Sequence, residues 1–499
     1  MKQSIIIYHT NDMHARISTT DDDNLAIGLD KISKIINLTK LNNINTFWFD
    51  GGDLLHGTPA INISTGDNMV KLLNPSKLNA AVAGNHDFNY GIDRLNELSK
   101  KLHPYILSAN TVYKDTHEHV LLPYIIYNID LNHDDKLEEN SNNSQQDNIK
   151  IGVFGLTTPE TAYKTNPNNV KDIEFLDPII IAKQMVNLLS KTCDIIIALT
   201  HLGLDESSKF TSKKLAEEVN DIDLIIDGHS HTMLMSGITI NNTLIVQTGW
   251  HDHMLGKVTL TFDNNKLINK KAELLDEATI DKLIGNTDKY ISNILTNIED
   301  DTNKILNKYI YTNNHKFSGD RLLVRRQESE LGNFITTILR RITKTHIAFI
   351  NGGDLRADLL EGDITYKDIL AIFPFETIIK AANIPGKLIK EMLEHSVEYV
   401  PASFGGFINI DGMTFSFNPN LPPLHRISNI IVGNELLNED KIYTVTLTDF
   451  MTVGGDGYSM IKDVEIIKDV GILSELIANY LQTDFEPIDY SIGRIKVLG

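Results

Sequence analysis

The stretch SIIIYHTNDMH, residues 4–14, begins as an apolar strand and ends in a polar cluster that contains Asp12 and His14. The same change from apolar to polar residues occurs four more times, in segments separated mostly by helix-like patterns. These segments are TFWFDGGD (46–53), AAVAGNHD (80–87), CDIIIALTHLG (193–203) and DLIIDGHSH (223–231). Alternating strands and helices predict an α/β fold. In such folds the carboxyl ends of the strands form the crevice where functional sites gather, so we expect these five clusters to lie together.

The chain has 499 residues, which is too long for one typical hydrophobic core, so at least two domains are expected. The alternating pattern predicts a first domain over 1–276, built around stacked sheets. Residues 277–314 are rich in helix formers and predict a helical linker, and 315–499 is expected to be a mixed α and β domain. The almost wholly polar segment 130–148 predicts a disordered surface insertion.

The charge of the chain bounds its partners. Asp and Glu number 66 against 46 Lys and Arg, which gives a formal net charge of −20. Such a surface repels a phosphate backbone, so a nucleic acid polymer is not an expected partner. A small anionic substrate is still compatible with the sequence where cations gather in one cleft, and bound metal ions would provide them.

The cysteine content limits the kind of metal site, and the hydropathy of the chain bears on its cellular location. Cys193 is the single cysteine, so an intramolecular disulfide and a thiolate metal cluster are both excluded. Any metal site must therefore use His, Asp, Glu or Asn. No stretch approaches the ~20 apolar residues that a membrane span requires. The first residues lack the apolar core of a signal peptide, which favours a cytoplasmic location, and an exported form with its leader removed is an open alternative.

The spacing of the polar residues indicates a metal site. Asp12 and His14 are two positions apart, as are His229 and His231, and on an extended backbone such residues face the same side. Imidazole ligands favour Zn²⁺, Mn²⁺, Co²⁺ or iron over Ca²⁺. Two divalent metal ions ~3.5–4 Å apart need a bridging carboxylate, for which Asp53 is the natural candidate.

The set D-x-H, GGD, GNHD, a later strand end with His201, and GHSH resembles the calcineurin-like metallophosphoesterase motif. Together with features of the second half, the chain is similar over nearly its whole length to the 5'-nucleotidase family. The resemblance implies an N-terminal β-sandwich flanked by helices, a helical linker and a mixed α/β C-terminal domain. It implies two divalent metal ions, one held by Asp12, His14, Asp53 and His231. It implies the second held by Asp53, Asn85, His201 and His229.

Two further histidines follow in GWHDHMLG, residues 249–256. His251 and His253 stand where relatives have other residues, so we expect them near the metal site but not as ligands.

The segment GNHDFNYG, residues 84–91, carries the expected proton donor. The resemblance implies that His86 meets the leaving group and that a carboxylate three residues later orients it. Here that residue is Asn89, whose amide can orient the ring but adds no negative charge, so His86 is expected to be a weaker base. Asp87 is expected to be structural. The FNYG variant also resembles the related 2',3'-cyclic-nucleotide 2'-phosphodiesterases.

Two arginine-containing stretches, RLLVRRQESELGN (321–333) and NGGDLR (351–356), supply cations for a phosphate. The resemblance implies a substrate site made of phosphate-binding arginines, a base-contacting Asn, two Phe that sandwich the base, and an Asp that binds the ribose. These residues are Arg325 and Arg356, Asn351, Phe407 and Phe450, and Asp456, respectively. Asp354 stands where many relatives have Gly, and the sequence gives no reason for it.

Three functions are compatible with these motifs. The first is a dimetal 5'-nucleotidase that releases phosphate from nucleoside 5'-monophosphates and whose range could extend to UDP-sugars. The second, favoured by Asn89, is a 2',3'-cyclic-nucleotide 2'-phosphodiesterase with 3'-nucleotidase activity. The third belongs to another class, a nucleotide-binding protein without turnover.

Overall fold

We describe the chain from a computed structural model, which describes all residues except 1–2, 20–24, 43–44, 132–147, 376 and 484–485. The disordered insertion predicted over 130–148 falls mostly on 132–147, outside the described residues. The chain forms two compact units, Met1–Thr302 and Asn303–Gly499. The domain boundaries expected from the sequence stay predictions.

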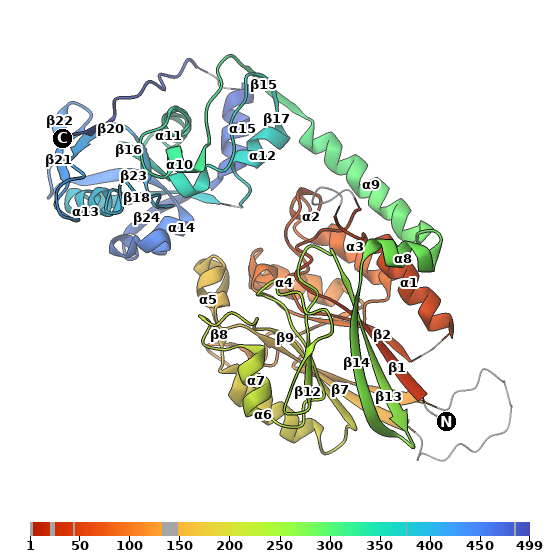
Figure 1. Cartoon of the computed structure of the whole chain (residues 1–499). Coiled ribbons are helices and arrows are strands. Elements are labelled where there is room, and N and C mark those ends of the chain that lie inside the picture. Colours follow the sequence, from red (N-terminus) through yellow and green to blue (C-terminus); the bar gives the residue numbers. More distant parts are fainter. Residues whose placement is uncertain (1–2, 20–24, 43–44, 132–147, 376, 484–485) are drawn as a thin grey trace. The chain divides into compact units, whose positions relative to one another are not determined.

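The first unit contains two six-stranded sheets (Figure 1). In order across the first sheet, the strands are β14 (Lys266–Leu275), β13 (Leu255–Asp263), β1 (Gln3–Thr10), β2 (Thr46–Asp50), β3 (Ala80–Val82) and β4 (Tyr105–Leu107). Across the second they are β11 (Ile238–Ile240), β12 (Thr243–Val246), β10 (Leu224–Ile226), β9 (Ile195–His201), β7 (Asn148–Thr157) and β6 (Tyr124–Asp130). Side chains of both sheets, among them Ile5, Ile7, Val153 and Ile197, share one buried cluster, so the sheets pack face to face as a sandwich.

Helices cover the outer faces of the sandwich, and an apolar stripe on each helix explains why. In α1, for example, Ile32, Ile35 and Ile36 are buried at helical spacing. The helices on the first sheet are α1 (Leu29–Asn42), α3 (Asp67–Ser76), α4 (Ile92–Lys101), α8 (Glu277–Ile284) and α9 (Lys289–Leu306). Those on the second are α6 (Pro178–Leu189) and α7 (Ser212–Glu218). The short elements are α2 (Pro59–Asn62), η2 (His86–Phe88), β5 (Thr111–Tyr113), α5 (Thr161–Lys164), η3 (Pro167–Val170) and β8 (Ile173–Phe175).

The centre of each sheet is parallel, and this places the site. Strands β1 to β4 run parallel in the first sheet. Strands β7, β9, β10 and β12 run parallel in the second. Parallel neighbours end at the same edge, so the loops that follow β1, β2 and β3 meet at one edge, and those that follow β9 and β10 meet at one edge of the other sheet.

The second unit is built on a five-stranded mixed sheet. Its strands are, in order, β19 (Ile408–Asp411), β16 (Ile347–Asn351), β23 (Ile442–Thr448), β18 (Ile378–Pro385) and β24 (Glu465–Ile472). A four-stranded sheet holds β22 (Glu435–Leu436), β21 (Ile427–Val432), β20 (Met413–Phe417) and β25 (Ile495–Val497), and β15 (Tyr309–Asn313) pairs with β17 (Gly362–Thr365).

Both faces of the five-stranded sheet are buried, as strand β16 illustrates. Ala348 and Ile350 join one core, whereas Ile347 and Phe349 join the other, because successive side chains of a strand point to opposite faces. The helices of this unit are α10 (Arg321–Val324), α11 (Glu330–Thr343), α12 (Tyr366–Ile372), α13 (Gly386–Ser396), α14 (Asp449–Thr452) and α15 (Leu473–Thr483). Its single-turn segments are η4 (Gly352–Asp354), η5 (Gly455–Gly457) and η6 (Ser459–Ile461).

The predicted fold class is confirmed, with a sandwich flanked by helices, a helical segment after it, and a mixed α/β second part. Across the described residues, no helix combines the length and the apolar character that crossing a bilayer requires.

Candidate metal centre

The predicted metal ligands come from the loops at the strand ends. Asp12 and His14 follow β1, Asp53 follows β2, and Asn85 follows β3. His201 is the last residue of β9, and His229 and His231 follow β10. Five of these seven residues have a positive φ, between 46° and 81°: Asp12, His14, Asp53, His229 and His231. Such backbone is rare outside glycine and costs energy, so these tight turns are held in place by the surrounding structure.

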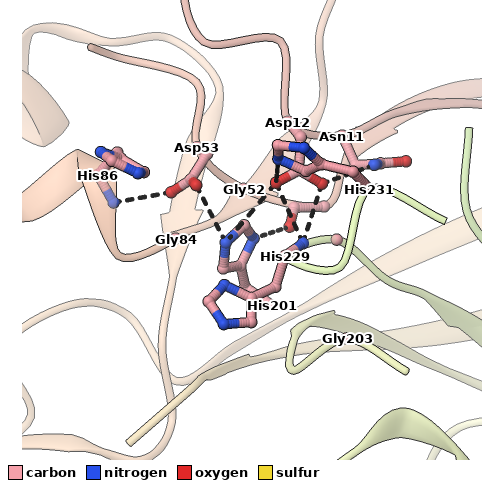
Figure 2. Close-up of polar contacts among 12 residues, drawn as sticks. Asn11, Asp12, Gly52, Asp53, Gly84, His86, His201, Gly203, His229 and His231 are labelled. Carbon is pink, nitrogen blue, oxygen red and sulfur yellow. Dashed lines mark hydrogen bonds and ion pairs between the residues drawn. The ribbon is translucent and has the colours of Figure 1, made fainter. Parts of the chain in front are cut away.

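An inner group consists of Asp12, Asp53 and His201, all of them buried (Figure 2). One ligand atom from each lies within 4.8 Å of the others. His201 Nε2 is 3.2 Å from Asp53 Oδ2 and 3.9 Å from Asp12 Oδ1. Two buried carboxylates next to one imidazole require a compensating positive charge.

An outer group consists of Asp12, His14 and His231. The Nε2 atoms of the two histidines face one another at 3.2 Å. His231 Nε2 is 3.5 Å from Asp12 Oδ1, and His14 Nε2 is 3.8 Å from Asp53 Oδ2. Two imidazole nitrogens and a carboxylate oxygen that converge in this way are typical ligands of a divalent metal ion.

The hydrogen bonds of His201 test whether a cation fits. Its Nδ1 lies 2.7 Å from the carbonyl oxygen of Gly51, which can only accept, so Nδ1 carries the proton. Nε2 is then the position that a second proton or a metal ion can occupy. It is buried, has no hydrogen-bond partner among the described residues, and lies at ion-pair distance from Asp53 and Asp12. The side-chain oxygen of Asn85 is also buried and, in the same part of the chain, without a partner. Both atoms belong to residues that the resemblance assigns to the same metal ion, and this set of donors fits one.

The electrostatics lead to the same conclusion. Burial alone would lower the pKa of His201, but the carboxylates of Asp53 and Asp12 raise it to about 10. Burial alone would raise the pKa of Asp53, but His201 and His86 hold it well below its usual range. The inner group therefore stabilises a positive charge between its carboxylates, which is what a divalent cation supplies.

His229 lies beside His201, with ring centroids 5.0 Å apart, but its Nε2 faces away from the inner group. Nε2 is 2.8 Å from Lys164 Nζ and 3.3 Å from Glu160 Oε2, both at helix α5. Burial, followed by the charges of His201 and Lys164, lowers the pKa of His229 to about 4, so the ring is neutral at physiological pH. Glu160 and Lys164 were missed by the sequence analysis, since nothing in their sequence marks them.

Asp87 has the structural role that was expected. Its carboxylate accepts four backbone N–H bonds of 2.7–3.1 Å, and in this way it joins the loop after β2 to the loop after β3. The donors are the backbone amides of Asp53, Leu54, Leu55 and Gly84.

His86 and Asn89 are paired as expected. The Asn89 side-chain amide donates to His86 Nδ1 at 3.0 Å and lies 3.2 Å from His56 Nδ1, while its oxygen accepts from the Thr165 hydroxyl at 2.8 Å. The backbone N–H of His86 donates to Asp53 Oδ1 at 2.8 Å. Because Nδ1 of His86 accepts, the proton of the neutral ring resides on Nε2. His56, which no motif in the sequence marks, stacks on His86 with ring centroids 6.1 Å apart.

The buried polar atoms of the second unit that have no hydrogen-bond partner in the described structure include Arg325 Nε, Asn351 Oδ1 and Asp354 Oδ2. The amide of Asn351 donates to Asp456 Oδ2 at 2.9 Å. Burial, followed by the charges of Asp456 and Asp449, raises the pKa of Asp354 to about 7. Polar atoms buried without partners are costly, so this group is suited to a polar ligand.

The two phenylalanines predicted to sandwich the base, Phe407 and Phe450, differ in their exposure to solvent. Phe450 is 37% exposed, whereas Phe407 is fully buried in the core. Phe404, three residues earlier, is half-buried and packs against Tyr399 at 4.7 Å between ring centroids. The stacking role of Phe407 stays a prediction. Arg356 is exposed, and its guanidinium lies 5.4 Å from the ring centre of Phe375.

Comparisons with known proteins also indicate a metallophosphoesterase. A family model described as calcineurin-like phosphoesterase matches residues 5–233, and one described as 5'-nucleotidase, C-terminal domain, matches 309–463. The chain is 28% identical to a trifunctional nucleotide phosphoesterase of Bacillus subtilis over 99% of its own length, and it spans 35% of that protein. It is 26% identical to a 5'-nucleotidase of Vibrio parahaemolyticus, covering 97% of this chain and 90% of the relative.

Solved structures share the fold of the whole chain. The 5'-nucleotidase precursor from Thermus thermophilus has a TM-score of 0.64 at 26% identity, with 99% of each chain covered. A putative 5'-nucleotidase from Staphylococcus aureus has a TM-score of 0.74 at 21% identity, again over 99% of each chain, which shows the fold alone. Since the two family models together match well over half of its residues, the chain belongs to the 5'-nucleotidase family of calcineurin-like metallophosphoesterases, which are metal-dependent phosphoric monoester hydrolases.

Proposed function

We propose that the chain is a dimetal nucleotidase that hydrolyses nucleoside 5'-monophosphates to nucleosides and phosphate. The observation that carries the proposal is the inner group. Two buried carboxylates, Asp12 and Asp53, lie against His201, whose Nε2 has no hydrogen-bond partner in the described chain. Relatives named 5'-nucleotidase that span nearly the whole chain give further support.

Two divalent cations would be held by the residues expected from the sequence. Asp12, His14, Asp53 and His231 would hold the outer one. Asp53, Asn85, His201 and His229 would hold the inner one. When bound, the cations supply the Lewis acidity and the charge that hydrolysis of a phosphate ester requires.

His86 is the proposed proton donor. The ester P–O bond breaks as water attacks phosphorus, and the leaving oxygen takes the Nε2 proton of the charged, doubly protonated form of His86. A proton given up by the attacking water returns the ring to that form. Asn89 holds the ring through the 3.0 Å contact to Nδ1, and Thr165 fixes the orientation of the amide. The backbone bond from His86 to Asp53 keeps the donor beside a carboxylate of the proposed metal site.

The second unit is proposed to bind the nucleotide. Arg325 and Arg356 would contact the phosphate, and Asn351 and Asp456 the nucleoside. The partnerless buried atoms Arg325 Nε and Asn351 Oδ1 support this assignment, because a bound substrate would give them the hydrogen bonds that the described chain does not.

A substrate panel tests the proposal. The purified chain, supplied with Mn²⁺ or Zn²⁺, should release phosphate from AMP and UMP, and UDP-glucose in the same panel measures whether UDP-sugars are hydrolysed. Asp53→Ala should lower kcat by at least about 10³-fold because both proposed cations lose a ligand. Full activity in Asp53→Ala would refute the mechanism.

A 2',3'-cyclic-nucleotide phosphodiesterase is the second candidate, favoured by the neutral Asn89 behind His86. The panel decides between the two when it includes 2',3'-cyclic AMP, 3'-AMP and 5'-AMP. A kcat/KM for the cyclic or 3'-substrate above that for 5'-AMP would replace the first proposal. Binding of AMP without release of phosphate would indicate a protein that binds nucleotides without turnover.

A further inference from the structure

The segment Trp250–His253 surrounds the two histidines of the outer group with aromatic rings. The indole of Trp250 stacks on the imidazole of His231, with ring centroids 5.9 Å apart and planes 18° apart. The ring of His251 meets that of His14 edge-on at 5.6 Å, and His253 packs against Trp250 at 5.5 Å. Offset stacking at such distances is attractive and restrains the tilt of both rings.

His231 is the proposed ligand that most needs such restraint. Its side chain is 41% exposed, whereas those of Asp12, Asp53 and His201 are at most 3% exposed. Metal-binding histidines normally donate their second ring nitrogen to a carboxylate or carbonyl, which fixes the ring. Among the described residues, no hydrogen bond reaches the second nitrogen of His231. The stacked Trp250 ring restrains the orientation of the His231 ring, as a hydrogen bond usually does at a metal-binding histidine.

The segment that carries Trp250 is itself fixed to the Asp12 loop. The Asn11 side chain donates to the carbonyl of Gly249 at 2.7 Å and accepts from the backbone N–H of Thr248 at 2.7 Å. The N–H of His251 donates to the carbonyl of Asp12 at 2.8 Å. The indole is therefore positioned relative to the same loop that supplies the carboxylate of the outer group.

The segment is also fixed from its other side. Asp252 is 2% exposed, and its carboxylate accepts the N–H of Gly28 at 3.1 Å, while its carbonyl accepts that of Ile27 at 2.9 Å. With both ends held, a movement of the Trp250 backbone away from His231 would require breaking buried hydrogen bonds.

We infer that Trp250 is a positioning residue for His231, and that the stacked indole sets the affinity of the outer metal position. The inference rests on the proposed dimetal function. Removal of the indole frees the most exposed proposed ligand to rotate, so the outer cation is bound more weakly while the inner position keeps its affinity. The inner ligand His201 is held by Gly51 and does not depend on Trp250.

Calorimetric titration of the metal-free chain with Mn²⁺ tests this. The wild type should bind two ions per chain, and His231→Ala identifies the event that belongs to the outer position. Trp250→Ala should weaken that event about 10- to 100-fold and leave the other unchanged. Trp250→Phe, which keeps a ring to stack, should restore most of the affinity. Tyr290→Ala, which removes a ring that is 65% exposed on α9, should have no effect.

Fluorescence gives a second measurement that does not depend on activity. The chain has two tryptophans, and Trp48 is fully buried, so Trp48→Phe leaves Trp250 as the single emitter. Its emission should change in step with the outer binding event, and His231→Ala should abolish that change. Unaltered Mn²⁺ affinities in Trp250→Ala, or an emission change that survives His231→Ala, would overturn the inference alone. A wild-type chain that binds no Mn²⁺ would overturn the proposed function and the inference together.

Discussion

A single side chain, Asn89, separates the proposed proton donor His86 from the arrangement expected by resemblance. The amide donates to His86 Nδ1 at 3.0 Å and also lies 3.2 Å from His56 Nδ1. A carboxylate in its place would accept from Nδ1 and stabilise the charged imidazolium. The amide supplies orientation without charge.

The substitution Asn89→Asp tests this role of charge. The carboxylate would accept from Nδ1 and stabilise the charged ring that donates the proton, so Asn89→Asp should raise kcat for 5'-AMP. Rates at saturating Mn²⁺ measure it. Thr165→Val removes the hydroxyl that orients Asn89 without adding charge, and it should lower kcat. An unchanged kcat in both variants would mean that Asn89 does not act on His86.

Asp354 has no role that could be inferred from the sequence, and in the structure its carboxyl lowers the stability of the folded chain in a pH-dependent way. Burial, followed by Asp456 and Asp449, raises its pKa to about 7 in the folded chain, against 3.8 for the free side chain. A carboxyl whose folded pKa is raised binds a proton more tightly in the folded than in the unfolded state. Its contribution to stability is therefore lost as pH rises from about 4 to about 7, and above that the loss is constant.

Asp354→Asn should accordingly stabilise the chain more at high pH than at low pH. The difference in unfolding free energy between variant and wild type should grow by on the order of 1–3 kcal/mol between pH 5 and pH 8, a range reduced for solvent screening of a half-buried group. Urea unfolding at both pH values measures it. Asp440→Asn, at an exposed position, should give a difference independent of pH. A pH-independent Asp354→Asn effect would mean that the carboxyl is ionised throughout.

At the scale of elements, the carboxyl ends of parallel strands explain why so much of the site could be predicted. Each apolar strand can be recognised in the sequence, and parallel neighbours end at one edge of their sheet, so Asp12 and Asp53 are expected to lie together. His201 ends a strand of the second sheet and joins them because the two sheets pack face to face. Trp250 could not be found in this way. It follows β12, a strand of the second sheet, and meets His231 only through packing.

The sequence also does not show which aromatic side chains are buried. Phe407 occupies an apparently exposed, glycine-rich context, yet its ring is fully buried, while Phe404 beside it is half-buried. A local pattern does not say which of two nearby rings enters the core, because that depends on the helix and sheet packed against them.

Asp87 connects the β2 and β3 loops, and its loss tests how far the site depends on that connection. Asp87→Ala leaves four backbone N–H groups without their acceptor, which should reduce the unfolding free energy by about 2–4 kcal/mol. Because Asp53 lies in the connected loop, Mn²⁺ affinity should fall as well. Urea unfolding and calorimetry measure the two effects, with the exposed Asp115→Ala as control. Wild-type stability in Asp87→Ala would mean that other contacts fix both loops.

At the scale of the whole molecule, helices α8 and α9 complete the core of the first unit. Ile280 and Ile284 of α8 and Ile291, Leu295 and Ile298 of α9 are buried in the same cluster as the helices of the first sheet. Burial of each such side chain is worth about 1.5–3 kcal/mol. A first domain that ended at residue 276, as expected from the sequence, would lack all five of these side chains. The apolar surface that they cover would then be exposed to water.

Two truncated chains test which boundary is physical. A fragment of residues 1–306 keeps α8 and α9 and should fold cooperatively, bind two Mn²⁺ ions and hydrolyse p-nitrophenyl phosphate. It lacks Arg325, Asn351 and Asp456, so it should lose the preference for AMP over that simple ester. A fragment of residues 1–276 should aggregate or unfold at much lower urea, because the apolar face against which α8 and α9 pack is open to water. Equal stability of the two fragments would mean that the two helices contribute nothing to the first unit and that the boundary expected from the sequence is correct.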